Sequence, residues 1–245
     1  MSGCDLAPIF EYVDACNRAT RMQDLADAAR KYYATTPARE TSYHHYPAFV
    51  SPGMEEGLRV LATGFPEDYV REYNRKKLWR VDPFVRLAAT ATAPFFWSEG
   101  LRDPSLSDHE LAYLEYMRGA NLGDGIAVPV YGPRGRNGYC GLGFGRGAPR
   151  PAPDVIAEIH WACQIGHLAY CRILTSRQPG ETALSAREKE ILGWIARGQT
   201  NNEIAETLHI SRNTVETYIR RCFEKLDVND RVSAALRGMA LGMVD

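Results

Sequence analysis

Four side chains between residues 69 and 97 have types that suit the binding of a small molecule. Tyr69 and Tyr73 lie four residues apart, and Asp82 follows Tyr73 after nine. Trp97 lies fifteen residues beyond Asp82. In an apolar pocket a carboxylate accepts from a buried N–H, a tyrosine hydroxyl donates to a buried carbonyl, and an indole ring provides an apolar wall. The residue types alone favour an aromatic core in which Asp82 caps a helix.

A second set of side chains, between residues 212 and 221, suits contact with nucleic acid. The apolar residues here follow intervals of 4, 3 and 4, which predicts one buried helical stripe made of Val215, Ile219, Cys222 and Leu226. The opposite face presents Arg212, Asn213, Glu216, Thr217, Arg220 and Arg221. Residues 211–225 hold four basic and two acidic residues, whereas the whole chain has a net charge of −1. Any affinity for DNA must therefore come from this local patch.

Capping signals divide the segment around this patch into four short helices. Two pairs have the spacing of a capping box, in which hydroxyl and carboxylate each satisfy a backbone N–H: Ser185 with Glu188, and Thr200 with Glu203. Gly198 is expected to end the first helix, Ser211 to cap the third, and a fourth helix to cover about 231–241. Two short helices, a tight turn at 209–210 and a polar-faced helix predict a helix-turn-helix. The alternative is a small helical bundle with a solvated charged face.

The residues before this segment mix helical and extended patterns without repeating βα units. Helical patterning covers 6–34, 65–79, 83–90, 105–120 and 153–174. In the first of these ranges the apolar positions at helical spacing are Leu6, Phe10, Val13, Leu25, Ala28 and Tyr32. Extended segments are expected at 41–47, 58–64 and 95–97, and two apolar runs around the turn-rich residues 132–138 predict a β-hairpin. These elements predict an α+β fold with an antiparallel sheet.

Length and composition allow two domains and exclude several classes of protein. The chain has 245 residues, 45% of them hydrophobic and 24% charged, which is ordinary globular composition. The polar stretch 175–183, which holds Pro179 and Gly180, is the best candidate for a linker. No apolar run reaches the length of a membrane span, and the N-terminus does not resemble a signal peptide. We therefore expect a cytoplasmic location and reduced thiols for the six cysteines.

Several other signals carry little chemistry. The stripe His160, Cys163, His167 and Cys171 covers eleven residues, or about 16 Å of helix, so a single metal ion could use only one adjacent pair. We expect this stripe to be core or subunit contact. The glycines at 141, 143 and 145 do not match a phosphate-binding loop, and His44 and His45 are expected to be structural. No nucleophile lies near a base in a recognisable motif, so we expect neither an enzyme, nor a metal, nor a cofactor.

The C-terminal segment resembles the DNA-binding domain of the LuxR family of bacterial regulators. The resemblance covers about 60 residues and begins with LSAREKEIL at 184–192. It includes Gly198, Glu203-Ile204-Ala205, Leu208, Ile210-Ser211, Thr214-Val215, Lys225-Leu226 and Arg231. The family commonly has Lys and His where this chain has Glu216 and Tyr218. A carboxylate is repelled by phosphate, so we expect Glu216 to orient an arginine or to accept from a cytosine amino group.

Residues 66–130 resemble the quorum-sensing members of this family, which bind acyl-homoserine lactones in an α/β/α sandwich. Those members place an aromatic pair four residues apart, Asp-Pro nine residues later and Trp fifteen residues after the Asp. The spacing of Tyr69, Tyr73, Asp82 and Trp97 matches this pattern, and Gly125 fits the family's glycine. The departure is Tyr69, where the family usually has Trp.

The resemblance implies a role for each of these residues. An acyl-homoserine lactone offers one amide N–H and carbonyl oxygens on an otherwise apolar body. Asp82 is expected to accept from the N–H, Tyr73 to donate to the acyl carbonyl, and Trp97 to form a wall for the ring. In the family the Trp indole donates to the lactone carbonyl; the hydroxyl of Tyr69 can also donate, with a different reach and direction.

The sequence therefore predicts a ligand-responsive transcription factor with three parts. Residues 1–174 form an autoinducer-binding and dimerisation domain, 175–183 a linker, and 184–245 a four-helix DNA-binding domain. The expected partners are promoter DNA, a second copy of the chain, an acyl-homoserine-lactone-like signal and RNA polymerase. One alternative is a regulator of the same family that responds to a non-lactone compound or to none, which Tyr69 motivates. An enzyme that acts on a small amide or lactone is the alternative from another class.

Overall fold

The computed structural model describes residues 6–46, 59–176 and 184–244, which divide into two compact units. The first unit contains a five-stranded sheet of β1 (Glu40–His45), β2 (Arg59–Thr63), β3 (Phe95–Phe96), β4 (Gly125–Val130) and β5 (Gly138–Gly143). The strand order is β2-β1-β5-β4-β3, and every neighbouring pair is antiparallel. The predicted hairpin is β4 with β5. The α+β fold with an antiparallel sheet is confirmed.

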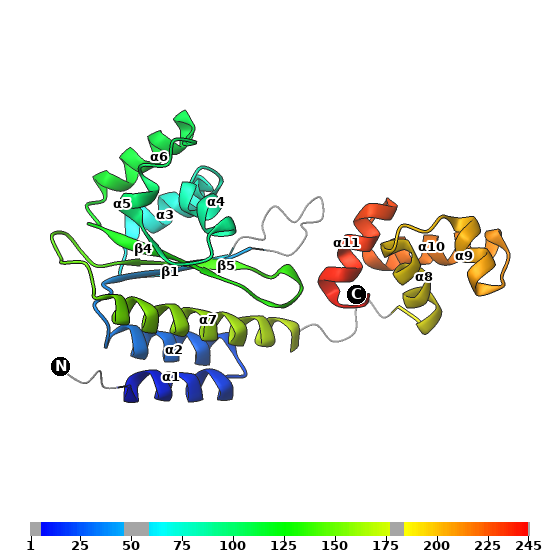
Figure 1. The fold of residues 1–245 in the computed structure, drawn as a ribbon, viewed down its shortest axis with the longest axis horizontal. Helices are drawn as coiled ribbons and strands as arrows, with labels where there is room; N and C mark the ends of the chain where they lie inside the picture. The colour runs from blue at the N-terminus through cyan, green and yellow to red at the C-terminus, as the bar shows by residue number, and fades with distance from the viewer. Residues whose placement is uncertain (1–5, 47–58, 177–183, 245) are drawn as a thin grey trace. The chain divides into compact units, whose positions relative to one another are not determined.

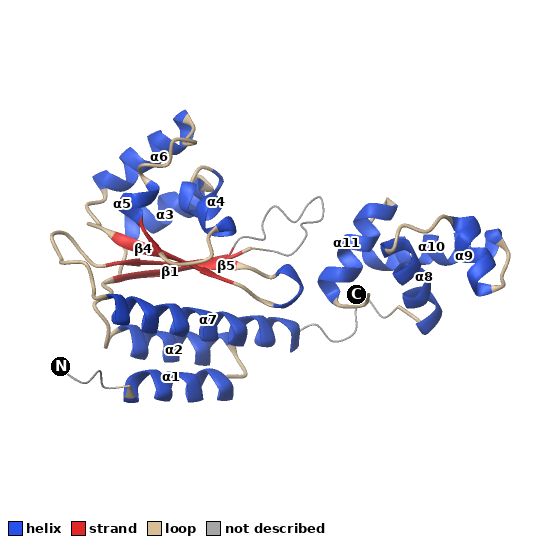
Figure 2. Cartoon of the chain, in the orientation of Figure 1, coloured by secondary structure: helices blue, strands red, loops and turns tan. Residues whose placement is uncertain are grey.

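Helices cover both faces of this sheet (Figures 1 and 2). One face carries α3 (Glu67–Arg75), α4 (Pro83–Thr90), α5 (Trp97–Gly100) and α6 (Asp108–Gly119). The other carries α1 (Ala7–Arg18), α2 (Met22–Tyr33) and α7 (Pro153–Ser176). The short 3₁₀ turns are η1 (Leu78–Arg80) and η2 (Pro133–Gly135). This arrangement is the expected α/β/α sandwich.

Alternation along β1 and β5 decides which side chains meet which helices. His44 pairs with Tyr139 and Ser42 pairs with Gly141, and these residues face the cavity under α3, α4 and α6. The residues between them face the other way, where Cys140 and Leu142 pack in a core with Ile159 of α7. Successive strand residues point to opposite faces, so one register sets both surfaces.

The helical patterning predicted over 6–34 is confirmed, and the strand predicted over 95–97 is wrong at its last residue. Residues 6–34 form two helices, α1 and α2, and the buried residues of α1 are Ile9, Tyr12 and Cys16. Leu6 and Phe10 are exposed, at 46% and 64% of their surface, because α1 turns a different face toward α2 and α7. Trp97 does not extend a strand; it starts α5 after the two-residue β3.

The second unit is built of α8 (Ala186–Ala196), α9 (Asn201–Leu208), α10 (Arg212–Leu226) and α11 (Arg231–Leu241). Both predicted capping boxes form, and Ser211 caps α10 by accepting from the N–H of Thr214. The predicted apolar stripe of α10 is buried at all four positions, Val215, Ile219, Cys222 and Leu226. The four-helix prediction for this segment is confirmed.

Two side chains at family positions of this unit, Glu188 and Arg231, each make two polar contacts. Glu188 is 3% exposed and accepts both from the backbone N–H of Ser185 and from the Lys225 ammonium, at 2.7 Å in each case. A buried carboxylate needs such partners, because desolvation disfavours its charge. Arg231 donates to Asn201 Oδ1 and to the carbonyl of Gln199, so it ties α11 to the start of α9.

Within the described ranges, no helix combines the length and apolar character needed to cross a membrane. Cys16, Cys140, Cys163, Cys171 and Cys222 are buried free thiols. Across the same residues, no group of three or more His, Cys, Asp or Glu side chains is arranged to hold a metal ion. In the stripe on α7, Cys163, His167 and Cys171 are buried, so these three positions are core.

Candidate functional site

Asp82 caps a helix and also receives tyrosine hydroxyls. It precedes α4, and its Oδ1 accepts from the N–H of Phe84 at 2.9 Å, as an N-cap aspartate does. Its Oδ2 accepts from the hydroxyl of Tyr73 at 2.8 Å and from those of Tyr113 and Tyr139 at 3.2 Å each. The helix-cap interpretation from the sequence is therefore correct and incomplete, because the second oxygen faces a pocket.

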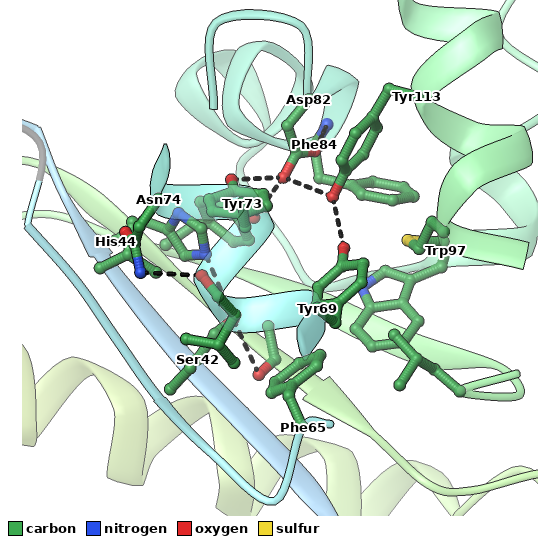
Figure 3. A pocket seen from close by; sticks show the side chains of 17 residues that line it. Ser42, His44, Phe65, Tyr69, Tyr73, Asn74, Asp82, Phe84, Trp97 and Tyr113 are labelled. Atoms are coloured by element: carbon green, nitrogen blue, oxygen red, sulfur yellow. Dashed lines mark hydrogen bonds between the residues drawn. The ribbon is translucent and has the colours of Figure 1, made fainter. Parts of the chain in front are cut away.

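The tyrosines reach Asp82 from three different elements, and Figure 3 shows Tyr73 and Tyr113 beside it. Tyr73 comes from α3, Tyr113 from α6 and Tyr139 from β5. Tyr69, one turn before Tyr73, shares a hydrogen bond of 2.9 Å with the hydroxyl of Tyr113. The predicted residues Tyr69, Tyr73 and Asp82 thus lie in one hydrogen-bonded network, which we call the tyrosine cluster together with Tyr113 and Tyr139.

The tyrosine cluster borders a cavity of about 40 Å³ between the sheet and helices α3, α4 and α6. All four residues predicted to bind a ligand line it: Tyr69, Tyr73, Asp82 and Trp97. Phe65 and Phe84 contribute further apolar surface. Space of this size accommodates only a few water molecules. A larger ligand must therefore displace the side chains that fill the pocket.

Gly125 is required by the position of Trp97. A Cβ atom at Gly125 would lie 2.7 Å from two atoms of the indole and 2.4 Å from the carbonyl oxygen of Leu142. Such distances are shorter than van der Waals contact, so any larger residue would push the ring away from the strand. The family glycine and the family tryptophan therefore describe one packing contact.

Burial dominates the electrostatics of the pocket. It raises the pKa of Asp82 to about 6, although the hydroxyls of the tyrosine cluster and the N–H of Phe84 oppose the shift. Burial and the nearby Asp82 raise the pKa of the Tyr73, Tyr113 and Tyr139 hydroxyls. These hydroxyls therefore stay protonated at neutral pH and remain hydrogen-bond donors.

Sequence reasoning did not assign Tyr113, Tyr139, Ser42 or His44 to the pocket, and all four line it. Tyr139 lies in the second strand of the predicted hairpin, and nothing in the local pattern indicates which face of that strand is inward. His44, expected to be structural, is 3% exposed and stacks on Tyr139 with ring centroids 4.2 Å apart. The pairing of β1 with β5 brings these residues to the pocket, and that pairing joins residues almost a hundred positions apart.

A larger cavity, of about 300 Å³, lies on the other face of the sheet against α2 and α7. Its walls include Tyr43, whose hydroxyl lies 2.8 Å from Nδ1 of His167. No carboxylate from the described residues lines it. It therefore lacks a charged acceptor comparable to Asp82, and the smaller cavity has the chemistry that suits a ligand with an amide N–H.

The second unit presents a polar helix face after a tight turn. The turn between α9 and α10 places His209 at a φ of 51°, with hydrogen bonds from its N–H to Glu206 and from the N–H of Ile210 to Ala205. This double closure ends a helix, and the left-handed residue is usually glycine. It turns the chain so that α10 follows α9 as the second helix of a helix-turn-helix.

The residues predicted to contact DNA lie along α10, and most of them are exposed. Arg212, Asn213, Glu216, Arg220 and Arg221 are exposed, and Thr217 is half-buried. Glu216 accepts from Nε of Arg212 at 2.9 Å. Arg212 and Arg220 lie four residues before and after Glu216, and Glu216 pairs with Arg212.

The remaining arginines are engaged only weakly. Arg220 lies 3.9 Å from Glu224, and the guanidinium of Arg221 lies 5.8 Å from the ring centre of Tyr218. Arg221 and Tyr218 also line a shallow hollow with Asn213, Thr214 and Thr217. Exposed ion pairs contribute little to stability, so these arginines can exchange their partners for phosphates or bases without loss of fold.

Both units of the chain match known protein families. Residues 21–170, more than half of the chain, match the family described as autoinducer binding domain. Residues 182–237 match the family described as bacterial regulatory proteins, luxR family. The chain belongs to the LuxR family. Both matching families are parts of transcriptional regulators and not of enzymes, in agreement with the expectation from the sequence.

Relatives of this LuxR-family regulator are described as transcriptional regulators or activators. It is 26% identical over 245 residues to the transcriptional activator protein AhyR of Aeromonas hydrophila, with 96% of this chain and 92% of AhyR covered. It is 29% identical over 205 residues to RpaR of Rhodopseudomonas palustris, a quorum sensing-dependent transcriptional regulator, with 79% of each covered. It is 31% identical to the HTH-type regulator y4qH of Sinorhizobium fredii, over 67% of this chain and 51% of that protein.

Solved structures show the same fold. The crystal structure of Escherichia coli SdiA is 21% identical, with a TM-score of 0.71 over 96% of this chain and 98% of SdiA. SdiA in complex with octanoyl-rac-glycerol has a TM-score of 0.75 at 20% identity, over 98% of this chain and 97% of that one. This LuxR-family regulator therefore combines an autoinducer-binding domain with a DNA-binding helix-turn-helix.

Proposed function

We propose that this regulator senses an acyl-homoserine-lactone-type signal through the tyrosine cluster and, as a dimer, reads promoter DNA with α10. The observation that carries the proposal is Asp82, a buried carboxylate whose Oδ2 collects three hydroxyl donors in an otherwise aromatic pocket. A ligand amide N–H can replace one of these donors. The hydroxyl so released can then donate to a ligand carbonyl, which would keep every buried polar group paired.

Trp97 and Tyr69 take the remaining roles in this proposal. Trp97 is 5% exposed and supplies the wall against which the lactone ring packs. Tyr69 donates to the lactone carbonyl in place of its hydrogen bond with the hydroxyl of Tyr113. Tyr73 donates to the acyl carbonyl.

The dimer part of the proposal is supported by exposed apolar residues on two helices. On α7, Trp161 and Leu168 lie seven residues apart and are 63% and 46% exposed. On α11, Val232 and Met239 have the same spacing and are 69% and 39% exposed. A seven-residue interval places side chains on one helical face, and such a face suits a second copy of the same helix. Each domain thus offers its own contact surface.

The DNA part assigns the exposed residues of α10 to a major groove. Arg212, Arg220 and Arg221 would contact phosphates or guanines, while Asn213, Glu216 and Thr217 would reach base edges. Two copies of α10 related by a two-fold axis would read a roughly palindromic site. RNA polymerase is the further partner in this proposal.

Thermal unfolding of the full chain tests ligand sensing. A panel of N-acyl-homoserine lactones with short to long acyl chains should include one that raises Tm by several degrees, because ligand at 100 times its Kd contributes about 2.7 kcal/mol. Asp82→Asn should weaken that ligand's binding about tenfold, since it replaces a charged acceptor by a neutral one. Asp124→Asn is the control, because Asp124 bonds to Ser98 outside the pocket lining.

If no lactone changes Tm or DNA affinity, lactone sensing by this chain is ruled out. A non-lactone signal is the second candidate, and two observations favour it. Tyr69 stands where the family usually has Trp, and its hydroxyl is already bonded to Tyr113. SdiA has been solved with octanoyl-rac-glycerol, an acyl compound that has no lactone ring. A Tyr69→Trp variant that gains a lactone response absent from the parent would support this candidate.

A further inference from the structure

His44 brings a second kind of polar group into the pocket, at a distance from Asp82. Its side chain lines the cavity and is 3% exposed. One face of the ring stacks on Tyr139 with centroids 4.2 Å apart, and the ring meets Tyr73 nearly at right angles, at 5.8 Å. The imidazole is thus held in place by aromatic neighbours, and only its two nitrogens are available for hydrogen bonds.

The two nitrogens of His44 are not equivalent. Nε2 lies 3.2 Å from Oγ of Ser42, and no described residue provides a hydrogen-bond partner for the buried Nδ1. Burial lowers the pKa of His44 to about 3, so the ring is neutral at physiological pH. A neutral imidazole has one N–H and one bare acceptor nitrogen.

Ser42 sets how the hydrogen of His44 is assigned. Its hydroxyl lies 3.5 Å from the carbonyl oxygen of Gly141 and 3.2 Å from Nε2 of His44, so the tautomer follows from which of these two atoms receives the hydroxyl proton. We assign that proton to the carbonyl of Gly141; Oγ of Ser42 then accepts from Nε2–H of His44, and Nδ1 is the bare acceptor. A buried acceptor without a donor is unfavourable, and a bound molecule can satisfy it by supplying the donor.

The position of Nδ1 relative to Asp82 indicates which part of a ligand it meets. Tyr139 joins the two sites, because its hydroxyl donates to Asp82 while its ring stacks on His44. Both sites therefore contact the same tyrosine side chain, Asp82 at its hydroxyl and His44 at the face of its ring. A ligand whose amide N–H binds Asp82 would place its acyl group, and not its lactone ring, beside His44 when Trp97 holds the ring.

We propose that Nδ1 of His44, oriented by Ser42, accepts a hydrogen bond from a hydroxyl on the acyl group of the signal, so that the pocket selects hydroxylated acyl chains. This inference rests on the proposed lactone sensing and names the ligand class within it. An unsubstituted chain leaves Nδ1 without a donor. A keto group in place of the hydroxyl would bring a second hydrogen-bond acceptor against Nδ1 of His44.

Three matched ligands test the selection: N-octanoyl-, N-3-hydroxyoctanoyl- and N-3-oxooctanoyl-homoserine lactone. The full-length protein should bind the hydroxy compound about tenfold more tightly than the unsubstituted one and should bind the oxo compound no better than the unsubstituted one. His44→Phe keeps the aromatic contacts and removes both nitrogens, so it should abolish this preference. His44→Asn places an amide oxygen near the position of Nδ1 and should retain it.

The measurements separate this inference from the proposed function. Equal binding of the three lactones by the parent protein, or a preference for the oxo compound, would overturn the role of Nδ1 while leaving lactone sensing intact. Failure of all three to bind overturns both, provided that the wider lactone panel also fails. Thermal unfolding of the ligand-free variants gives a further readout, since removal of an unpaired acceptor should leave Tm of His44→Phe unchanged or raised. A Tm lowered by several degrees would instead assign His44 a structural role.

Discussion

Ligand-free protein should lose about 2 to 3 kcal/mol of stability between pH 4 and pH 7 through Asp82 alone. Its pKa is raised to about 6 in the folded protein from 3.8, the ordinary value expected when the chain is unfolded, mainly by burial. A carboxyl group with a raised folded pKa binds its proton more tightly when folded. Its stabilising contribution is therefore fully present below about pH 4 and is lost as the pH rises through 6.

Urea unfolding of the parent protein and of Asp82→Asn, at several pH values, isolates this contribution. Asparagine cannot ionise, but it can still accept from the N–H of Phe84 and so keep the cap of α4. The stability of the variant relative to the parent should rise by about 2 to 3 kcal/mol from pH 4 to pH 7. Asp124→Asn controls for the loss of a carboxylate elsewhere in the same domain. A difference between parent and Asp82→Asn that does not vary with pH would show that burial does not destabilise the Asp82 charge.

Glu216→Lys should change which DNA sequence the protein prefers, with a shift of roughly 5- to 150-fold in the ratio of affinities for two operators. The physical reason is that a base contact contributes about 1–3 kcal/mol of discrimination, whereas the exposed Arg212–Glu216 pair contributes only about 0.2–0.5 kcal/mol to the helix. Lysine in place of Glu216 would remove the acceptor for a cytosine amino group. It would also release Arg212 from its 2.9 Å contact.

Selection of binding sites from random DNA by both proteins, followed by salt titrations, checks this expectation. Glu224→Lys is the matched control. Glu224 lies two turns beyond Glu216 on the same helix, and among the described residues its carboxylate has only the long 3.9 Å contact with Arg220. The control should strengthen binding to all DNA and increase its salt dependence without a new preference. The same uniform effect from Glu216→Lys would mean that Glu216 acts only as an electrostatic brake.

The DNA-binding unit was predictable almost residue by residue, because its signals are local. A capping box acts over three residues, and a buried helical stripe repeats every three or four. Ser185 with Glu188, Thr200 with Glu203 and the stripe of α10 each form as expected. The partner of Glu188 was not predictable in this way, because Lys225 is 37 positions away and meets it only when α10 packs on α8.

The first helices show where local periodicity fails. Residues at helical spacing form a helix, but periodicity does not show which of two apolar faces is buried. Leu6 and Phe10 have the spacing, yet Ile9, Tyr12 and Cys16 are the residues that α1 buries. The choice is made by the surface of α2 and α7, and that surface exists only after these helices have come together.

The cavity beside Asp82 was likewise predictable only in part. The spacing of Tyr69, Tyr73, Asp82 and Trp97 lies within one stretch of chain, and all four residues do line one cavity. Tyr113, Tyr139, Ser42 and His44 complete that cavity from α6, β5 and β1, where no nearby motif indicates their role. Local spacing could identify Asp82 because a helix cap and its flanking residues are neighbours in sequence. The three hydroxyls on its Oδ2 and the bare nitrogen of His44 depend on strand register and helix packing, which bring together residues that are distant in the chain and bury them away from water.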